Sequence, residues 1–491
     1  MKKVPLSLLI IFLIHFSTWS QPRLINVKSK KFKTSKGLKI VGDIGYLEVA
    51  ENRNDPNSRR IRVKYVHLKS LAASPGTPVV YLEGGGGTST WEVNSPIDLA
   101  SRIDLLQVSD LVFLDRRGAT DESLVYIWKK DYPSDFFLSE AAANQHYQNM
   151  ASAALEKFAA NKVDVTGYQI EEHARDVDEL MNALGFDRYN LYGFSYGSHI
   201  GMTVMKLFPD RVERAILAGA DATNQAFNYP RYLDEHVKKI GQLVAADSVL
   251  STQIPDFRTL VASTMERLEK SPAIVTVKNP LTRKEMNLSI GAFGLALVLR
   301  LDIDDANDIP AIPRLLHTIN QGDYSMLTWF VQKRLKLTLG FPGQGINQQL
   351  ASGASDTRWS TIEQEASQSL FGNAVNFPFS AVKDYWIDND LSFDPSIPLK
   401  TSIPTLFISG TLDCRTPVDQ VEKMLVGFED ATHVIVDNAG HEQAMWAYLV
   451  NDEIIPAFLK GRPITQIRTR TKKIRFLPLE GPTDGHPSTS Q

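Results

Sequence analysis

The segment Gly193-Phe194-Ser195-Tyr196-Gly197 places a serine between two glycines. Residues 189–192 before it are a short apolar run that predicts a buried strand, and a helical pattern follows up to Pro209. A serine on a tight strand-to-helix turn has strained backbone angles, so it needs small neighbours on both sides. The N-terminus of the helix also favours negative charge near the serine. Many such five-residue patterns are ordinary Gly/Ser turns, but in this context the pattern predicts that Ser195 is a nucleophile.

A serine hydroxyl needs a neighbouring base to become nucleophilic at neutral pH. Among the ten histidines, His441 is the best candidate because it lies in the loop after a late apolar run, 433–436. His433 begins that same run and is expected at the opposite end of the strand. A surface or structural role is the alternative for any single histidine, but the position of His441 after the final strand favours the base.

The third member of such a set is a carboxylate that fixes the tautomer and orientation of the imidazole. Asp413 follows the apolar run 404–408, and the order Ser, Asp, His along the chain is the one expected for a serine on this kind of turn. Asp221 also follows a strand-like run and is the second option. Asp437 is closer to the histidine in sequence but is too constrained. Asp413 is therefore the preferred acid.

Negative charge on a reacting carbonyl oxygen requires two backbone N–H donors. The amide of Tyr196, directly after the serine, is one predicted donor. The other is expected in the run of four glycines, 84–87, that follows Glu83 and an early strand, because glycines let the backbone approach a substrate closely. A phosphate-binding loop would need a following Lys-Ser/Thr pair, which is absent from the sequence. Gly85 is the preferred donor, with Gly86 next.

The elements that must position these residues alternate between strands and helices. Short strands are expected at 65–68, 78–82, 111–114, 189–192, 215–218, 404–408 and 433–436. A helix is expected over 171–184, where apolar residues recur at helical spacing before Gly185. This alternation predicts an α/β fold with a mostly parallel central sheet and helices on both faces.

The strand pattern breaks between residues 224 and 399, where the segments are helix-like. Such an insertion predicts a helical cap over the active site, carried by a catalytic domain formed from 21–223 and 400–460. Residues 461–491 are basic and then rich in Gly, Pro and Ser, which predicts a disordered tail after a short ordered stretch.

Residues 1–20 have the features of a signal peptide. Lys2 and Lys3 precede the apolar stretch 4–16, and small residues precede Gln21. The stretch is shorter than the roughly 20 apolar residues that a membrane span needs. The sequence therefore predicts export to the periplasm or the extracellular space, without stable membrane insertion after cleavage.

The overall composition is compatible with a soluble enzyme that needs no special partner. Basic and acidic residues number 53 and 56, so no nucleic-acid partner is expected. Cys414 is the only cysteine, which excludes an intramolecular disulfide, and it is expected to be a partly buried, unreactive thiol. No metal-ligand cluster is evident, and the expected chemistry needs no cofactor. The oligomeric state cannot be predicted.

Several motifs together resemble the prolyl and tripeptidyl aminopeptidase branch of the α/β hydrolases, the serine peptidases of family S33. The family's oxyanion loop, His/Asn-Gly-Gly-Pro-Gly, is similar to residues 83–87, and its Asp-Gln-Arg-Gly turn is similar to residues 115–118. Further similar segments are 45–49 with 51–53, 208–212, and 410–413 with Thr416-Pro417. The resemblance covers 45–223 and 400–460 but not the cap. Gly86 in place of proline and Arg116 in place of glutamine are departures from the family pattern.

The resemblance implies an aminopeptidase of prolyl or tripeptidyl type that acts on short peptides. Such an enzyme must bind a free α-amino group, for which carboxylates in a partly desolvated pocket are suited. Glu365, near Glu363 in the cap, is similar to an acidic cap position in exported relatives; a solvated helix face is the alternative for it. A carboxylesterase that uses the same Ser-His-Asp set on small esters is the second hypothesis. A non-catalytic binding protein on the same scaffold is the third.

Overall fold

The computed structural model describes residues 22–33, 39–85, 103–119, 121–128, 132–387 and 391–480. The predicted signal peptide, Gly86 and the end of the predicted tail lie outside the described residues. Within the described part of the chain, no helix is long and apolar enough to cross a membrane.

A ten-stranded sheet forms the centre of the molecule, in the order β1-β2-β3-β5-β4-β7-β8-β12-β13-β14. The first three strands pair antiparallel, and all pairs from β5 to β14 are parallel. The strands are β1 Arg23–Lys33, β2 Lys39–Ala50, β3 Arg60–Leu68, β4 Gly76–Leu82, β5 Ser109–Leu114, β7 Tyr189–Phe194, β8 Val212–Ala218, β12 Thr405–Gly410, β13 Ala431–Asp437 and β14 Arg468–Arg470.

Helices cover both faces of the parallel part of the sheet. Every residue of β7 and β12 is buried, as expected for strands with helices on both sides. One face packs against α4 (Ile170–Ala183) and α5 (Tyr196–Leu207), and the other against α2 (Ile103–Leu106), α16 (Gln443–Trp446) and α17 (Ile455–Leu459). This arrangement confirms the predicted fold class.

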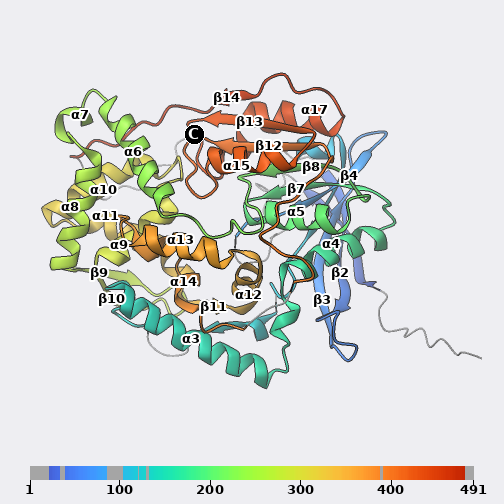
Figure 1. The fold of residues 1–491 in the computed structure, drawn as a ribbon, viewed down its shortest axis with the longest axis horizontal. Helices are drawn as coiled ribbons and strands as arrows, with labels where there is room; N and C mark the ends of the chain where they lie inside the picture. Colours follow the sequence, from blue (N-terminus) through green and yellow to red (C-terminus); the bar gives the residue numbers. More distant parts are fainter. Residues whose placement is uncertain are drawn as a thin grey trace, which may run out of the picture.

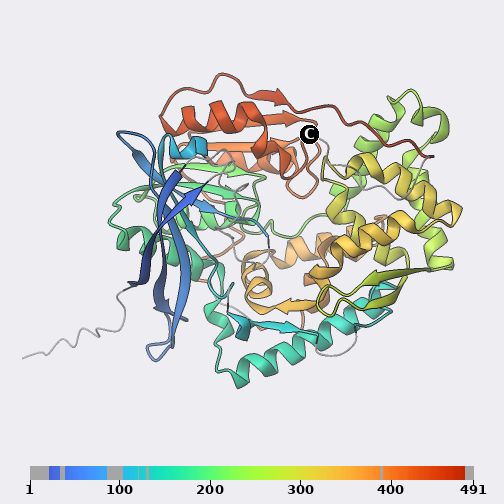
Figure 2. The ribbon, with the colours of Figure 1, turned by 180° about the vertical axis from the view of Figure 1, so that it is seen from behind.

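A second layer of mostly helical structure lies beside the carboxyl edge of the sheet (Figures 1 and 2). Its larger helices are α6 (Arg231–Ala245), α8 (Phe257–Lys270), α9 (Ala292–Asp302), α10 (Ile312–Gln321), α11 (Ser325–Leu335), α12 (Gly343–Ser352) and α13 (Asp356–Ala366). It also holds an antiparallel hairpin of β9 (Ala273–Lys278) and β10 (Glu285–Ile290). We call residues 224–399 the cap.

One segment outside that range also packs on the cap. Strand β6 (Val125–Ile127) pairs with β11 (Gly340–Pro342), and helix α3 (Glu140–Ala160) contacts α14 (Phe379–Val382). Figure 1 shows α3 running along the outside of the cap. The cap is therefore built from two parts of the chain that flank the central strands.

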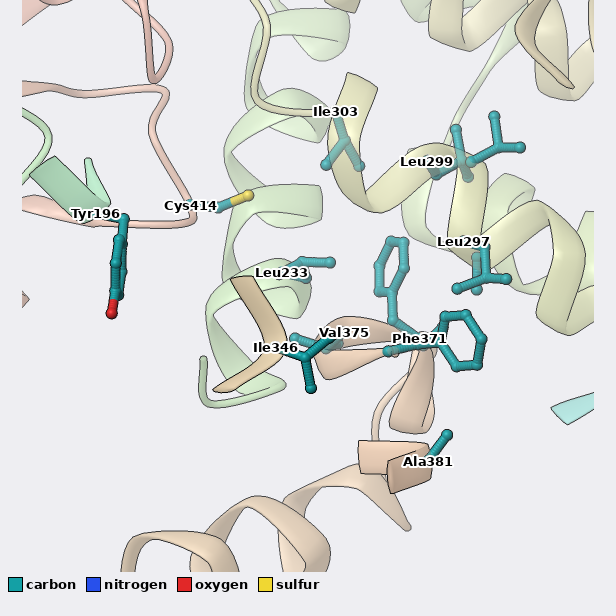
Figure 3. Packing of buried hydrophobic residues seen from close by; sticks show 14 of the residues in the cluster. Tyr196, Leu233, Leu297, Leu299, Ile303, Ile346, Phe371, Val375, Ala381 and Cys414 are labelled. Carbon is teal, nitrogen blue, oxygen red and sulfur yellow. The ribbon is translucent and has the colours of Figure 1, made fainter. Parts of the chain in front are cut away.

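The cap and the catalytic loops share one hydrophobic core. Tyr196 and Cys414 from the sheet edge belong to the same buried cluster as Leu233 of α6 and Leu297 of α9 (Figure 3). At the end of the described chain, the backbone N–H of Leu477 donates to Pro310 in the cap (2.9 Å), so the C-terminal segment also links the two layers.

Candidate active site

Ser195 lies on the sharp turn between β7 and α5. Its backbone angles, φ 51° and ψ −127°, are in a region that residues other than glycine rarely adopt. The flanking glycines are required by space: a Cβ on Gly197 would lie 1.9 Å from the carbonyl oxygen of Leu82, and one on Gly193 would lie 2.5 Å from that of Gly197. The predicted strained serine turn is therefore present.

His441 lies in the loop after β13 and is hydrogen-bonded on both ring nitrogens. Its Nε2 is 2.9 Å from Ser195 Oγ, and its Nδ1 is 2.8 Å from Asp413 Oδ2. The ring is buried, and the Phe194 ring packs beside it at a centroid distance of 5.0 Å. A histidine held in this way can accept a proton from the serine hydroxyl while the carboxylate orients it.

Asp413 follows β12 and is surrounded by hydrogen-bond donors. The backbone N–H groups of Arg415 and Thr416 donate to Oδ1, each at 2.9 Å, and the Thr416 hydroxyl donates to Oδ2 at 2.5 Å. Burial alone would raise the pKa of Asp413, but the positive charge of His441 and these hydrogen bonds hold it well below its usual range. The carboxyl group is thus ionised throughout the range in which a histidine base can act.

Asp221, the second predicted option for the acid, has no printed hydrogen bond to His441. It is buried at the end of β8, and its Oδ1 has no hydrogen-bond partner. Burial raises its pKa to about 7, although the charges of Arg358 and His441 oppose this shift. The structure therefore brings Asp413, rather than Asp221, into contact with the histidine.

The two remaining alternatives lie away from the trio. Asp437 forms an ion pair with Arg468 of β14 (2.7 Å). His433 is hydrogen-bonded to Ser409 Oγ (2.9 Å), and burial lowers its pKa to about 4. Cys414 is buried, and burial raises the pKa of its thiol, in line with the unreactive thiol that the sequence predicts.

Arg116 holds the start of the glycine loop against the serine turn. Its guanidinium donates to the carbonyl oxygen of Gly84 at 2.6 Å and to that of Gly85. Gly84 lies directly beside the serine, since a Cβ added there would be 2.8 Å from Ser195 Cβ. In a trans peptide the N–H points opposite to the preceding carbonyl, so anchoring the Gly84 carbonyl also fixes the direction of the Gly85 N–H. Arg116 thereby orients the predicted oxyanion donor.

Tyr196, the other predicted donor, is the first residue of α5, where backbone N–H groups have no partner within the helix. Its ring lies 5.6 Å from the Arg116 guanidinium carbon. The sequence singled out Arg116 only as a departure from a family pattern. No local signal showed that this side chain reaches the glycine loop, because the two are about thirty residues apart.

Glu365, the predicted amine-binding residue, is already paired with a cation. Its carboxylate accepts hydrogen bonds from the guanidinium of Arg231 and, at 3.2 Å, from the backbone N–H of the same residue. Glu363 pairs with Lys383 at 3.2 Å. A contact between either glutamate and a substrate amine stays a prediction, and for Glu365 that amine would have to compete with Arg231.

The cap contains an open cavity of about 650 Å³ between α12, α13 and the segment after α14. Its walls include Trp359 and Trp386, and its charged residues include Asp356, Asp384 and Lys383. The trio Ser195, His441 and Asp413 is not part of its described lining. No group of three or more His, Cys, Asp or Glu side chains that could hold a metal ion occurs among the described residues.

Comparison with known families agrees with the topology of the sheet and the serine turn. Residues 77–260 match the family described as alpha/beta hydrolase fold. The chain is an α/β hydrolase. Residues 386–461 of this α/β hydrolase, which include the loops of Asp413 and His441, match the family described as TAP-like protein.

Two curated proteins are similar to parts of this α/β hydrolase. Serine protease Hip1 of Mycobacterium tuberculosis is 31% identical over 119 residues, which are 23% of this chain and 23% of that protein. Haloalkane dehalogenase 2 of the same species is 45% identical over 51 residues, which are 10% of this chain and 18% of that protein. The match therefore spans about a quarter or less of the length of these relatives. Among solved structures, a bromoperoxidase from Bacillus anthracis is 14% identical with a TM-score of 0.37, covering 84% of this chain and 99% of that one.

Proposed function

We propose that this α/β hydrolase is an exported serine aminopeptidase of prolyl or tripeptidyl type that releases short fragments from the N-terminus of peptides. The observation that carries the proposal is the hydrogen-bonded chain from Ser195 through His441 to Asp413, with contacts of 2.9 and 2.8 Å. The match to the TAP-like family and the partial similarity to a serine protease support a peptide as substrate.

In the proposed mechanism Ser195 Oγ attacks the scissile carbonyl while His441 Nε2 accepts the hydroxyl proton. The carbonyl oxygen becomes negative and receives hydrogen bonds from the backbone N–H groups of Gly85 and Tyr196. His441 then returns the proton to the leaving amine, which breaks the C–N bond and leaves an acyl-enzyme. Water attacks this ester with His441 again as base, and the acid product leaves with Ser195 restored.

A carboxylesterase is the second candidate, and one observation favours it. The carboxylate of Glu365, which was predicted to bind a substrate amine, is occupied by Arg231. An ester needs no amine-binding carboxylate, and the same Ser-His-Asp set performs both reactions through the same acyl-enzyme.

Hydrolysis of a small substrate panel distinguishes the two candidates. Purified mature protein is tested on proline and alanine anilides with free and acetylated N-termini, and on short-chain nitrophenyl esters. We expect cleavage of the free-amine anilides, loss of cleavage after acetylation, and loss of all activity in Ser195→Ala. Turnover of esters alone, again lost in Ser195→Ala, would establish the esterase instead.

A matched pair of histidine variants provides the control. His441→Gln is expected to abolish turnover and labelling by a fluorophosphonate probe, whereas His433→Gln, which alters the same strand at its other end, is expected to retain both. Activity that persists in Ser195→Ala would exclude the proposed nucleophile. Absence of both labelling and turnover in the wild-type protein would instead favour a non-catalytic binding role.

Export is the remaining part of the proposal, and it is supported by the charged and apolar pattern of residues 1–20. When the full chain is produced in a Gram-negative host, N-terminal sequencing of the periplasmic protein is expected to begin at Gln21. Full-length protein confined to the cytoplasmic fraction would contradict this expectation.

A further inference from the structure

A single cap residue, Asp304, contacts both loops that carry the catalytic candidates. Its backbone carbonyl accepts a hydrogen bond from the backbone N–H of His441 at 3.1 Å. Its carboxylate accepts two hydrogen bonds from Arg415, at 2.7 Å from Nε and 2.8 Å from Nη2. Arg415 lies between Asp413 and Thr416, so Asp304 links the acid loop to the histidine loop.

The histidine loop is seated closely on this part of the cap. A Cβ added to Gly440 would lie 2.0 Å from the carbonyl oxygen of Asp304, so the loop and the cap backbone touch directly. Gln443 adds a second bridge: its side chain donates to Asp305 Oδ1 at 2.8 Å and accepts from the N–H of Ala306 at 3.3 Å. The position of His441 therefore depends on where cap residues 304–306 lie.

The ion pair at the centre of this contact is well suited to hold a fixed geometry. The Asp304 side chain is completely buried, and the paired guanidinium nitrogens match its two oxygens, which restricts both distance and angle. Burial opposes the charged form of Arg415, but the charge of Asp304 outweighs it and raises the pKa of the arginine. The neighbours Ile303 and Cys414 pack into the shared apolar cluster (Figure 3), which supports the pair on its apolar side.

We infer that Asp304 is a positioning residue through which the cap holds His441 and Asp413 in register for proton transfer. The inference rests on the proposed serine-hydrolase function of the same trio. It assigns the cap a part in assembling the catalytic geometry, in addition to any part in selecting substrate. The substrate itself is not required for this role, because both contacts exist without one.

Asp302 provides a matched control two residues away. Its side chain is equally buried and pairs with Lys333 at 2.9 Å and with Arg334, which are both cap residues. Asp302→Asn therefore removes a buried charge and its ion pairs within the cap, while Asp304→Asn removes the same charge from the contact with the acid loop.

The experiment compares the two variants by the rate at which a fluorophosphonate probe labels Ser195, and by kcat and KM on whichever panel substrate the wild-type protein cleaves. We expect Asp304→Asn to lower the labelling rate and kcat by about 10- to 100-fold with KM within about twofold of wild type, because small displacements of catalytic groups have effects of this size. Asp302→Asn is expected to remain within about threefold of wild type in both. Equal losses in the two variants, or unchanged kinetics in Asp304→Asn, would overturn the inference.

A spectroscopic measurement separates this inference from the proposed function. The proton shared by His441 Nδ1 and Asp413 gives a low-field NMR signal that does not require turnover. We expect Asp304→Asn to shift or broaden this signal and Asp302→Asn to preserve it, even in a protein that cleaves no panel substrate. If Asp304→Asn does not fold, Gln443→Met tests the same link without a buried charge; a wild-type signal and labelling rate in that variant would then overturn the inference.

Discussion

The loops after β8 and β12 each bring an aspartate to the same edge of the sheet, but the two carboxyl groups have opposite surroundings. Asp413 is 1% exposed and receives hydrogen bonds from Thr416, from two backbone N–H groups and from His441. Asp221 is 8% exposed, and its Oδ1 receives none. The pKa of Asp413 lies well below its usual range, whereas that of Asp221 is raised to about 7.

The difference shows that the donors around a buried carboxyl group, and not its burial, determine whether it is ionised. A catalytic acid of this kind must be negative in order to orient an imidazole and stabilise its charged form. Only the loop after β12 supplies the donors that keep its aspartate negative. Position at the end of a parallel strand is shared by both residues and does not separate them.

The largest effect is expected when the two aspartates are replaced by asparagine in turn. Asp413→Asn should lower kcat by about 10⁴-fold, because an amide in place of the carboxylate favours the wrong imidazole tautomer. Asp221→Asn should retain kcat within a few-fold, since its carboxyl group does not contact His441. Steady-state kinetics on the substrate found in the panel measures both. A comparable loss in the two variants would remove the distinction between the loops.

Thr416 permits a finer test of the donors themselves. Its hydroxyl lies 2.5 Å from Asp413 Oδ2 and 3.2 Å from His441 Nδ1. Thr416→Val removes that donor but leaves the two backbone N–H donors, so we expect kcat to fall by about tenfold, in proportion to one lost charge-assisted hydrogen bond. Thr416→Ser restores the hydroxyl and should return kcat close to the wild-type value. A serine variant as impaired as the valine variant would attribute the loss to packing.

The comparison also shows which parts of the site could be predicted from sequence. The strands and the serine turn depend on local patterns, and helix α4 spans Ile170–Ala183 where 171–184 was expected. The choice between Asp413 and Asp221 stayed open because each follows a strand, and only the three-dimensional set of donors separates them. Neither the Asp304–Arg415 pair nor the Glu365–Arg231 pair has a local signal, since their members are 111 and 134 residues apart.

The smallest expected effect is a change in the pH dependence of stability. The pKa of Asp221 in the folded protein, about 7, is above the usual value of 3.8, so the folded state binds more protons than the unfolded state between these pH values. Wild-type stability therefore falls as pH rises from about 4 to 7. Asp221→Asn lacks this proton exchange, and its unfolding free energy relative to wild type should increase over that window by up to about 4 kcal/mol and then level off.

Asp413→Asn serves as the reference for this measurement because its pKa shift has the opposite sign. The folded-state pKa of Asp413 is depressed, so its contribution to stability is fully present above the unfolded value and is lost only as pH falls through the folded one. Relative to wild type, the unfolding free energy of Asp413→Asn should thus be constant between pH 5 and 8, which urea denaturation can measure. A rising difference for Asp221→Asn beside a flat one for Asp413→Asn would separate the two loops by stability alone. A flat difference for Asp221→Asn would instead mean that its carboxyl group is ionised at neutral pH, and that the partner of its Oδ1 is a group other than a proton.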